Sequence, residues 1–130
     1  DLLADVAATS DQRPAGLIPA PADRATLRER GFNQAAEIAR HLSRRLGIPW
    51  RPTGLRRLHH ATSQRGLGRA KRRRNVATAF EAETGLPAQV ALVDDVVTSG
   101  ATADAAARAL KRAGVKTVAL WAIARTPRRP

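Results

Sequence analysis

The sequence predicts an α/β protein in which a central, mostly parallel sheet is flanked by helices. An unbroken apolar run at residues 90–93 is typical of a parallel strand that is covered on both faces. Apolar stretches at residues 16–21 and 115–124 accompany two segments with helical spacing, at residues 34–46 and 102–113. Strands that alternate with helices favour a parallel sheet with right-handed crossovers.

The composition fits a single domain, residues 1–130, with an aliphatic core. Hydrophobic residues make up 43% of the chain and aromatic residues only 3%, and this length is typical of one domain. The absence of cysteine excludes disulfides and thiolate metal sites and favours a cytoplasmic location. No apolar run reaches the roughly 18 residues that a membrane helix needs, so we expect no membrane partner.

Positive charge is concentrated in the middle of the chain. The formal net charge is +12, and residues 24–74 carry 15 of the 23 lysines and arginines but only two acidic residues. A field of this sign attracts polyanions. Pyrophosphate, nucleotides and nucleic acids all qualify, so charge alone does not choose among them.

The N-terminal third of the chain begins with a helical pattern that has no N-cap. Residues 1–12 have helical spacing without a cap, so we expect the domain to be N-terminally incomplete. The short strand at residues 16–21 is stopped by prolines, which cannot donate to a ladder. Residues 22–33 are polar and basic and are expected to form a loop.

The helix at residues 34–46 has clear start and stop signals. Asn33 is a suitable N-cap, Gly47 suits the position after the last turn, and a proline two residues later prevents continuation. Residues 48–62 are expected to be irregular, although a hairpin between residues 48 and 80 would add strands to the sheet. Residues 81–87 are expected to be a linker.

The C-terminal third contains the second helix and the last strand. Gly114 ends the helix, and the strand at residues 115–124 places Trp121 on one face. Residues 125–130 are expected to be a flexible basic tail. The expected buried face of the helix is Ala105, Ala106, Ala109, Leu110 and Ala113.

The strand at residues 90–93 leads directly into a candidate binding site. Asp94 and Asp95 would lie at the carboxyl end of this strand, where open α/β sheets bind ligands. Adjacent carboxylates can accept hydrogen bonds from the vicinal hydroxyls of a ribose or share a hydrated Mg²⁺. The glycine turn and helix N-terminus that follow suit an anion. The turn consists of Thr98, Ser99, Gly100, Ala101 and Thr102.

This stretch therefore predicts a site for a sugar held by its diol and its 5′-phosphate. One alternative is a purely structural strand with a solvated acidic end and a capped helix. Another is a phospho-acceptor or Mg²⁺ site of receiver type, which explains the acids but not the turn.

Two basic segments could bind further phosphate groups. Arg28 and Arg30 follow the first strand, and guanidinium groups match phosphate oxygens bidentately. Residues 63–76, which include Arg65 and Arg69, are glycine-containing and basic and are expected to be mobile. The alternative for each segment is a solvated basic surface that binds nothing.

Three motifs in order resemble the competence protein F (ComF) family, also called the GntX or amidophosphoribosyltransferase-like group. The first is Arg-Glu-Arg-Gly-Phe-Asn-Gln at residues 28–34. The second is Gln-x-Gly-Leu-x-Arg-x-x-Arg-x-x-Asn-Val at residues 64–76. The third, at residues 90–102, resembles the phosphoribosyl pyrophosphate (PRPP) signature of type I phosphoribosyltransferases. The resemblance covers residues 17–126.

The resemblance implies the type I phosphoribosyltransferase (Rossmann-like) fold and an Mg²⁺-dependent transfer of the phosphoribosyl group from PRPP to an unidentified acceptor, with release of pyrophosphate. It assigns Asp94 and Asp95 to the ribose hydroxyls and residues 98–102 to the 5′-phosphate. It places Arg28 and Arg30 near the pyrophosphate, and residues 63–76 in a loop that closes over the site. It also implies a possible homodimer.

The chain departs from the family in the stretch before the first strand, where the family has a further helix and basic positions that are mostly missing here, and in one further feature of the family. Family members often carry an N-terminal four-cysteine zinc ribbon, whereas this chain has no cysteine. Enzymes that act on 6-oxopurines usually have an acid where Thr98 stands, which argues against a hypoxanthine or guanine acceptor.

Two non-enzymatic functions are alternatives on the same fold. One is nucleic-acid binding or regulation linked to DNA uptake, because residues 65–74 contain six basic residues. No aromatic residue lies among them, so such binding should be non-specific. The other is a PRPP sensor without turnover.

Overall fold

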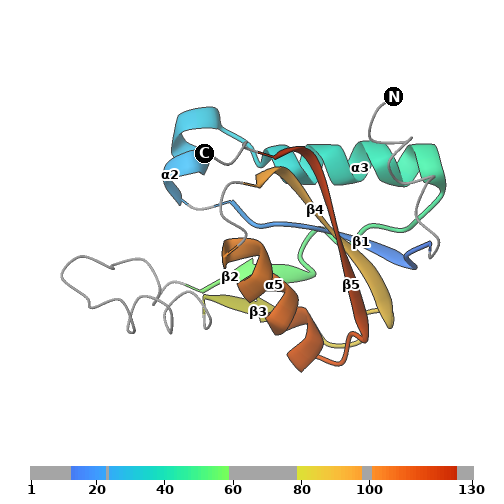
Figure 1. The fold of residues 1–130 in the computed structure, drawn as a ribbon. Coiled ribbons are helices and arrows are strands. Elements are labelled where there is room, and N and C mark those ends of the chain that lie inside the picture. Colours follow the sequence, from blue (N-terminus) through green and yellow to red (C-terminus); the bar gives the residue numbers. More distant parts are fainter. Residues whose placement is uncertain (1–12, 23, 59–78, 98–100, 126–130) are drawn as a thin grey trace, which may run out of the picture.

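The computed structural model describes residues 13–22, 24–58, 79–97 and 101–125 (Figure 1). Within these ranges the chain forms a three-stranded parallel sheet, a separate two-stranded antiparallel sheet and three helices. This confirms the α/β class with a parallel sheet flanked by helices. In chain order the elements are β1 (Gly16–Pro19), α2 (Arg24–Arg30), α3 (Gln34–Leu46), β2 (Leu55–Arg57), β3 (Phe80–Ala82), β4 (Gln89–Val97), α5 (Ala101–Arg112) and β5 (Thr117–Arg125).

The strand β4 is the centre of the parallel sheet, with β1 on one side and β5 on the other. A further parallel bridge joins Leu17 of β1 to Trp50, so the segment after α3 lies at the outer edge of β1. The chain therefore leaves β1 in one direction through α3 and leaves β4 in the other direction through α5. Right-handed crossovers in opposite directions put their helices on opposite faces, which is where α3 and α5 pack (Figure 1).

Alternate residues of β1 and β4 divide the core into two parts, because successive side chains of a strand point to opposite faces. One set packs with α5 and the other with α3, and every member is at most 1% exposed. Burial on both faces explains why residues 90–93 form a continuous apolar run. The sets are Ile18, Val90 and Leu92 on the α5 side and Leu17, Ala91 and Val93 on the α3 side.

The two long helices follow the sequence signals closely. Asn33 caps α3 by accepting a hydrogen bond from the Ala35 amide, and Gly47 ends it with φ of 68°, a left-handed conformation that favours glycine. Four of the five residues expected on the buried face of α5 are buried. Ala113 is only half-buried, because it follows the last helical residue, Arg112.

One predicted loop contains a helix. Residues 24–30 form α2, so the expected loop at residues 22–33 is wrong over this part. Arginine, alanine, leucine and glutamate, which make up most of α2, are all good helix formers. Gly31, with φ of 79°, follows the helix and turns the chain towards α3.

The expected hairpin forms from β2 and β3, but it does not extend the central sheet. It is a sheet of its own, in which Leu55 lies opposite Ala82 and Arg57 opposite Phe80. Leu55 and Phe80 pack in the same cluster as α5. The hairpin thus covers the core beside α5, and the expectations of an irregular segment before residue 62 and a linker from residue 81 are wrong where β2 and β3 form.

Some predicted segments lie outside the described residues. They include the N-terminal helical pattern at residues 1–12 and the basic loop at residues 63–76. Of the tail expected at residues 125–130, only Arg125 is described, and its backbone belongs to β5. In the described part of the chain, no helix is long and apolar enough to cross a membrane.

Gly54 lies where the turn before β2 passes over Ile18. A Cβ at position 54 would lie 2.8 Å from Ile18 Cδ1 and 3.1 Å from Arg51 Cβ. We expect Gly54→Ala to lower the free energy of unfolding by about 1–3 kcal/mol, because such overpacking forces neighbours to move. Urea denaturation measures this. Thr53→Ala, at an exposed neighbour, should change it by about 0.5 kcal/mol or less; equal values for the two variants would contradict the proposed packing.

Candidate functional site

The parallel sheet opens at the carboxyl ends of β1 and β4. The β1–β4 pairing ends with Pro19 opposite Val93, whereas β4 stays paired with β5 as far as Val97. Asp94 and Asp95 therefore lie beside β5 but beyond the end of β1. The prediction that the acids end the strand is wrong, because β4 continues past them; they lie instead where β1 leaves the sheet.

A cavity of about 160 Å³ occupies this position. The crossovers from β1 and β4 run in opposite directions, and in open α/β sheets such a point leaves a ligand crevice outside the carboxyl ends of the strands. The lining comes from α2, α3, the hairpin, β4 and α5, and from the segments that follow β1 and precede α3. It consists of Ala20, Pro21, Ala22, Arg30, Asn33, Gln34, Arg57, Phe80, Leu92, Asp94, Asp95, Thr102, Ala103 and Ala106.

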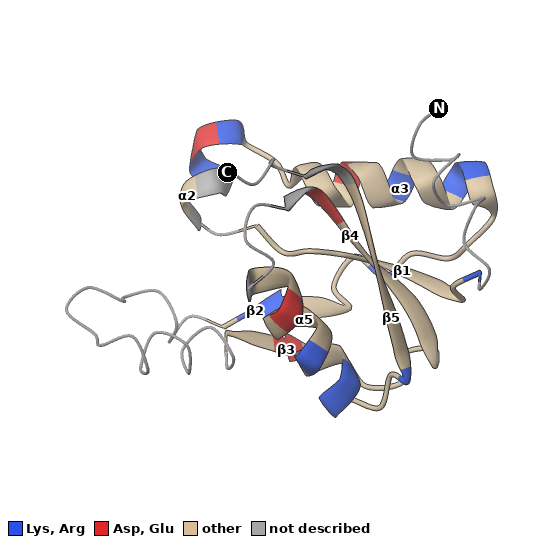
Figure 2. Ribbon diagram, viewed as in Figure 1, with Lys and Arg blue, Asp and Glu red and all other residues tan. Residues whose placement is uncertain are grey.

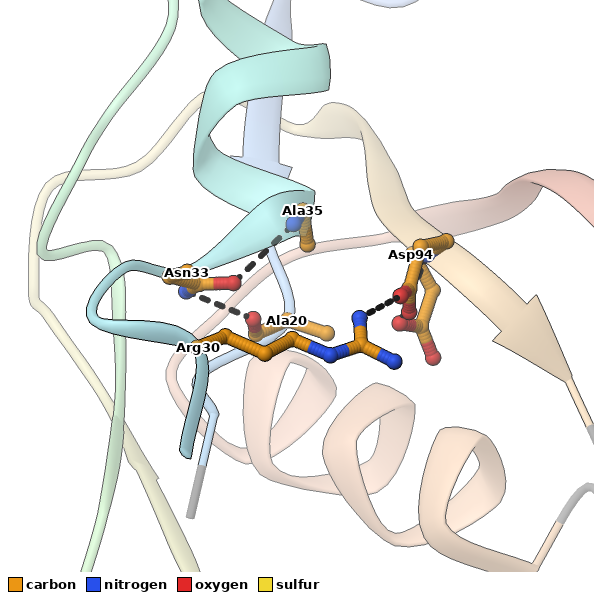
Figure 3. Close-up of polar contacts among 6 residues, drawn as sticks. Ala20, Arg30, Asn33, Ala35 and Asp94 are labelled. Carbon is orange, nitrogen blue, oxygen red and sulfur yellow. Dashed lines mark hydrogen bonds and ion pairs between the residues drawn. The ribbon is translucent and has the colours of Figure 1, made fainter. Parts of the chain in front are cut away.

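Asn33 ties the start of α3 to the end of β1. Its Oδ1 accepts from the Ala35 amide at 3.0 Å, and its Nδ2 donates to the Ala20 carbonyl at 3.1 Å (Figure 3). One side chain therefore pairs with an amide in the first turn of α3, which has no partner within the helix, and with the carbonyl of the residue that follows β1. The two contacts hold one wall of the cavity in place.

Arg30, the last residue of α2, reaches the acid pair. Its Nη1 lies 3.3 Å from Asp95 Oδ2, and Figure 3 shows the guanidinium extending along the cavity towards the carboxylates. The side chain of Arg30 is half exposed, so the pair contributes little to stability. It does place a guanidinium beside Asp95, where it could contact a phosphate oxygen.

The two carboxyl groups interact with each other. The Asp95 amide donates to Asp94 Oδ1 at 2.8 Å. The pKa of Asp94 is raised from 3.8 to about 6, first by burial and then by the side-chain hydrogen bond with Asp95 and the charge of Asp95. The backbone hydrogen bond and the charge of Arg57 oppose these effects. Ionisation of both carboxyl groups near neutral pH is therefore unfavourable, and bound hydroxyl donors or a cation would stabilise the ionised form.

Arg57 is a lining residue that the sequence did not single out. Side chains alternate along β2, so Arg56 is exposed and pairs with Glu81 at 2.8 Å, whereas Arg57 lies at the cavity. Its Nη2 lies 3.3 Å from the Pro21 carbonyl, and its Cζ lies 4.8 Å from the centroid of the Phe80 ring. Two adjacent arginines in a strand must face opposite sides, but this signal is usable only once the strand is recognised.

The structure brings together part of the predicted site. Asp94, Asp95, Arg30 and Thr102 all line the cavity. Ala101 begins α5, so the amino end of this helix is directed towards the same region. Arg28 is exposed on α2 and does not line the cavity. Residues 98–100 of the turn, as well as Arg65 and Arg69, lie outside the described residues.

The acid pair suits Mg²⁺ only as part of a larger set of ligands. Among the described residues there is no cluster of three or more histidine, cysteine, aspartate or glutamate side chains that could hold a metal. Mg²⁺ is commonly bound by one or two carboxylates together with phosphate oxygens of a substrate. The donor set of Asp94 and Asp95 fits that mode, in which the ligand supplies the remaining oxygens.

Curated relatives of known name match most of the chain. It is 37% identical over 116 residues to competence protein F of Haemophilus influenzae, which is 86% of this chain and 51% of that protein. It is 37% identical over 121 residues to DNA utilization protein YhgH of Escherichia coli O157:H7, which is 91% of this chain and 52% of that protein. The chain thus spans about half the length of the relatives it matches. No family model and no solved structure match it.

The raised pKa of Asp94 makes stability depend on pH. The folded chain keeps a proton that the unfolded chain releases above its pKa of 3.8, so stability should fall as pH rises from 3.8 towards about 6. Asp94→Asn removes this effect. At each pH the free energy of unfolding of the variant is compared with that of the wild type. We expect this difference to shift in favour of the variant by roughly 1–3 kcal/mol as pH rises across this range.

Chemical denaturation at a series of pH values measures this shift. Asp104→Asn, which removes a carboxylate at an exposed position on α5, is measured beside it as the control. A difference between Asp94→Asn and the wild type that stays constant with pH would show that Asp94 titrates normally.

Proposed function

We propose, from the premise that this chain belongs to the competence protein F family, that its cavity binds the ribose 5-phosphate part of PRPP. The proposal is based on the acid pair, Asp94 and Asp95, which lies just beyond the last paired residues of β1 and β4. Asp94 and Asp95 are adjacent, line the cavity and retain contact with solvent. Two neighbouring carboxylates of this kind match the two neighbouring hydroxyls of a ribose.

The surrounding elements suit the rest of the ligand. The amino end of α5 begins beside the acid pair, and Thr102 in its first turn adds a hydroxyl to the lining. Amide groups at a helix N-terminus favour a phosphate. Arg30 supplies a guanidinium at Asp95 for a second phosphate group. These contacts would fix a sugar by its hydroxyls and by its phosphates.

We further propose that the bound PRPP donates its phosphoribosyl group to an unidentified acceptor and releases pyrophosphate. The carbon that carries pyrophosphate would become positively charged as the leaving group departs, and the nearby carboxylates favour that charge. The contribution of the protein is to position the reactants and to stabilise charge. Mg²⁺, held by Asp94 or Asp95 together with ligand oxygens, would neutralise the pyrophosphate.

The first test is calorimetric titration of PRPP with Mg²⁺. We expect the wild type to bind and Asp94→Asn combined with Asp95→Asn to bind about a hundredfold more weakly or not at all, because both acceptors for the hydroxyls are weakened. Circular dichroism confirms that the variant is folded.

The matched control is Glu37→Gln combined with Asp104→Asn, which removes the same charge at exposed positions outside the cavity. It should bind like the wild type. Equal affinity of the cavity variant and this control would exclude the site assignment.

A second candidate function is non-specific binding of nucleic acid. The net charge of +12 favours it, and the relatives are named as competence and DNA utilization proteins. Basic residues of the described chain are spread over α2, α3 and α5 (Figure 2), with Arg44 and Arg45 exposed at the end of α3. A dispersed positive surface suits contacts to phosphates without base recognition.

Fluorescence anisotropy with duplexes of different sequence tests this second function. We expect similar affinities for all sequences, and the logarithm of the binding constant should fall linearly with the logarithm of the salt concentration. Asp94→Asn with Asp95→Asn should not weaken this binding, since it removes negative charge. A salt-insensitive preference for one sequence would contradict the idea.

A further inference from the structure

Arg57 brings a positive charge to the cavity from the hairpin. The acid pair lines the cavity from β4, whereas Arg57 comes from β2, which belongs to the separate sheet. Its charge acts on Asp94, whose pKa it lowers against the stronger effect of burial. The cavity therefore contains carboxylates from one sheet and a guanidinium from the other.

The guanidinium of Arg57 is held in place. Its Nη2 lies 3.3 Å from the carbonyl of Pro21, two residues after β1, and its Cζ lies 4.8 Å from the centroid of the Phe80 ring, a side chain that is 3% exposed. A cation over an aromatic face is attracted to it. The planar group thus has little freedom to lose when it contacts a ligand.

The hydrogen bonding of this guanidinium is incomplete. Its Nε is buried and has no hydrogen-bond partner among the described residues. A buried donor without an acceptor costs free energy, and such groups in native structures call for an explanation. Two neighbouring arginines of the described chain differ, because each pairs with a carboxylate. Arg51 pairs with Glu83, and Arg56 pairs with Glu81 of β3.

We propose that Arg57 is an anion-binding residue of the cavity and contacts a negatively charged oxygen group of the ligand. Its fork is planar, oriented and without a carboxylate partner in the described part of the chain, which suits a phosphate or carboxylate group. The group could be the pyrophosphate of the donor or a carboxylate of the acceptor. The choice between these two groups rests on the proposed function. The anion site itself does not, since it is defined by Arg57, Phe80 and Pro21.

The test compares three probes by calorimetry: pyrophosphate with Mg²⁺, benzoate as a planar carboxylate, and ribose 5-phosphate. We expect Arg57→Gln to weaken binding of pyrophosphate or of benzoate by about tenfold or more, with ribose 5-phosphate unaffected. A loss confined to pyrophosphate assigns Arg57 to the donor, and a loss confined to benzoate assigns it to the acceptor.

Two further variants separate binding from folding. Arg57→Lys keeps the charge but not the fork, so it should recover part of the lost affinity. Arg56→Gln removes the same charge from the same strand at an exposed position and should bind all probes like the wild type. Thermal unfolding of each variant reports on the loss of the Phe80 contact. If Arg57→Gln does not fold, the comparison of Arg57→Lys with Arg56→Gln decides.

Three outcomes would overturn the inference. They are wild-type protein that binds neither pyrophosphate nor benzoate, Arg57 variants with unchanged affinities, and an equal loss for ribose 5-phosphate, which would indicate a merely structural role. Binding of PRPP is measured in parallel. If PRPP fails to bind while pyrophosphate or benzoate binding still depends on Arg57, the proposed function fails and the anion site stands.

Discussion

The rest of the structure depends on the pairing of β4 with β1 and β5, because β5 stays paired with β4 further along the strand than β1 does. On one side the pairing of β1 stops at Pro19, and Pro21 just beyond it has no amide N–H that could continue the ladder. On the other side β5 stays paired with β4 past the acid pair. The difference leaves the backbone of β4 supported on one edge and open on the other. The cavity occupies that open edge, so the length of β1 determines where a ligand can reach the sheet.

The same arrangement explains the chemistry of the acid pair. Asp94 continues the alternation of a strand whose preceding four residues are almost completely buried, so it starts from an apolar environment. Burial is accordingly the first cause of its raised pKa. Asp95, which faces the other way, meets Arg30. Two identical side chains thus acquire different surroundings through their position in the strand, and both remain within one cavity.

Three separate parts of the chain supply cations or dipoles to this cavity. Arg30 comes from α2, Arg57 comes from the hairpin, and the amino end of α5 follows β4 directly. Each lies on an element that packs on the sheet or connects to it, rather than on the sheet itself.

The sequence by itself determined the elements whose signals are local. The four apolar residues of β4, the Asn33 cap and Gly47 at the end of α3 each predict structure within a few residues, because periodicity and capping act over one or two turns. The acid pair was also identified from its place directly after the apolar run at residues 90–93. Only the tertiary structure decided the approach of Arg30 to Asp95, 65 residues apart, and the placement of Arg57 on Phe80. Such contacts depend on how distant elements pack, and no local pattern of charge or hydrophobicity encodes that packing.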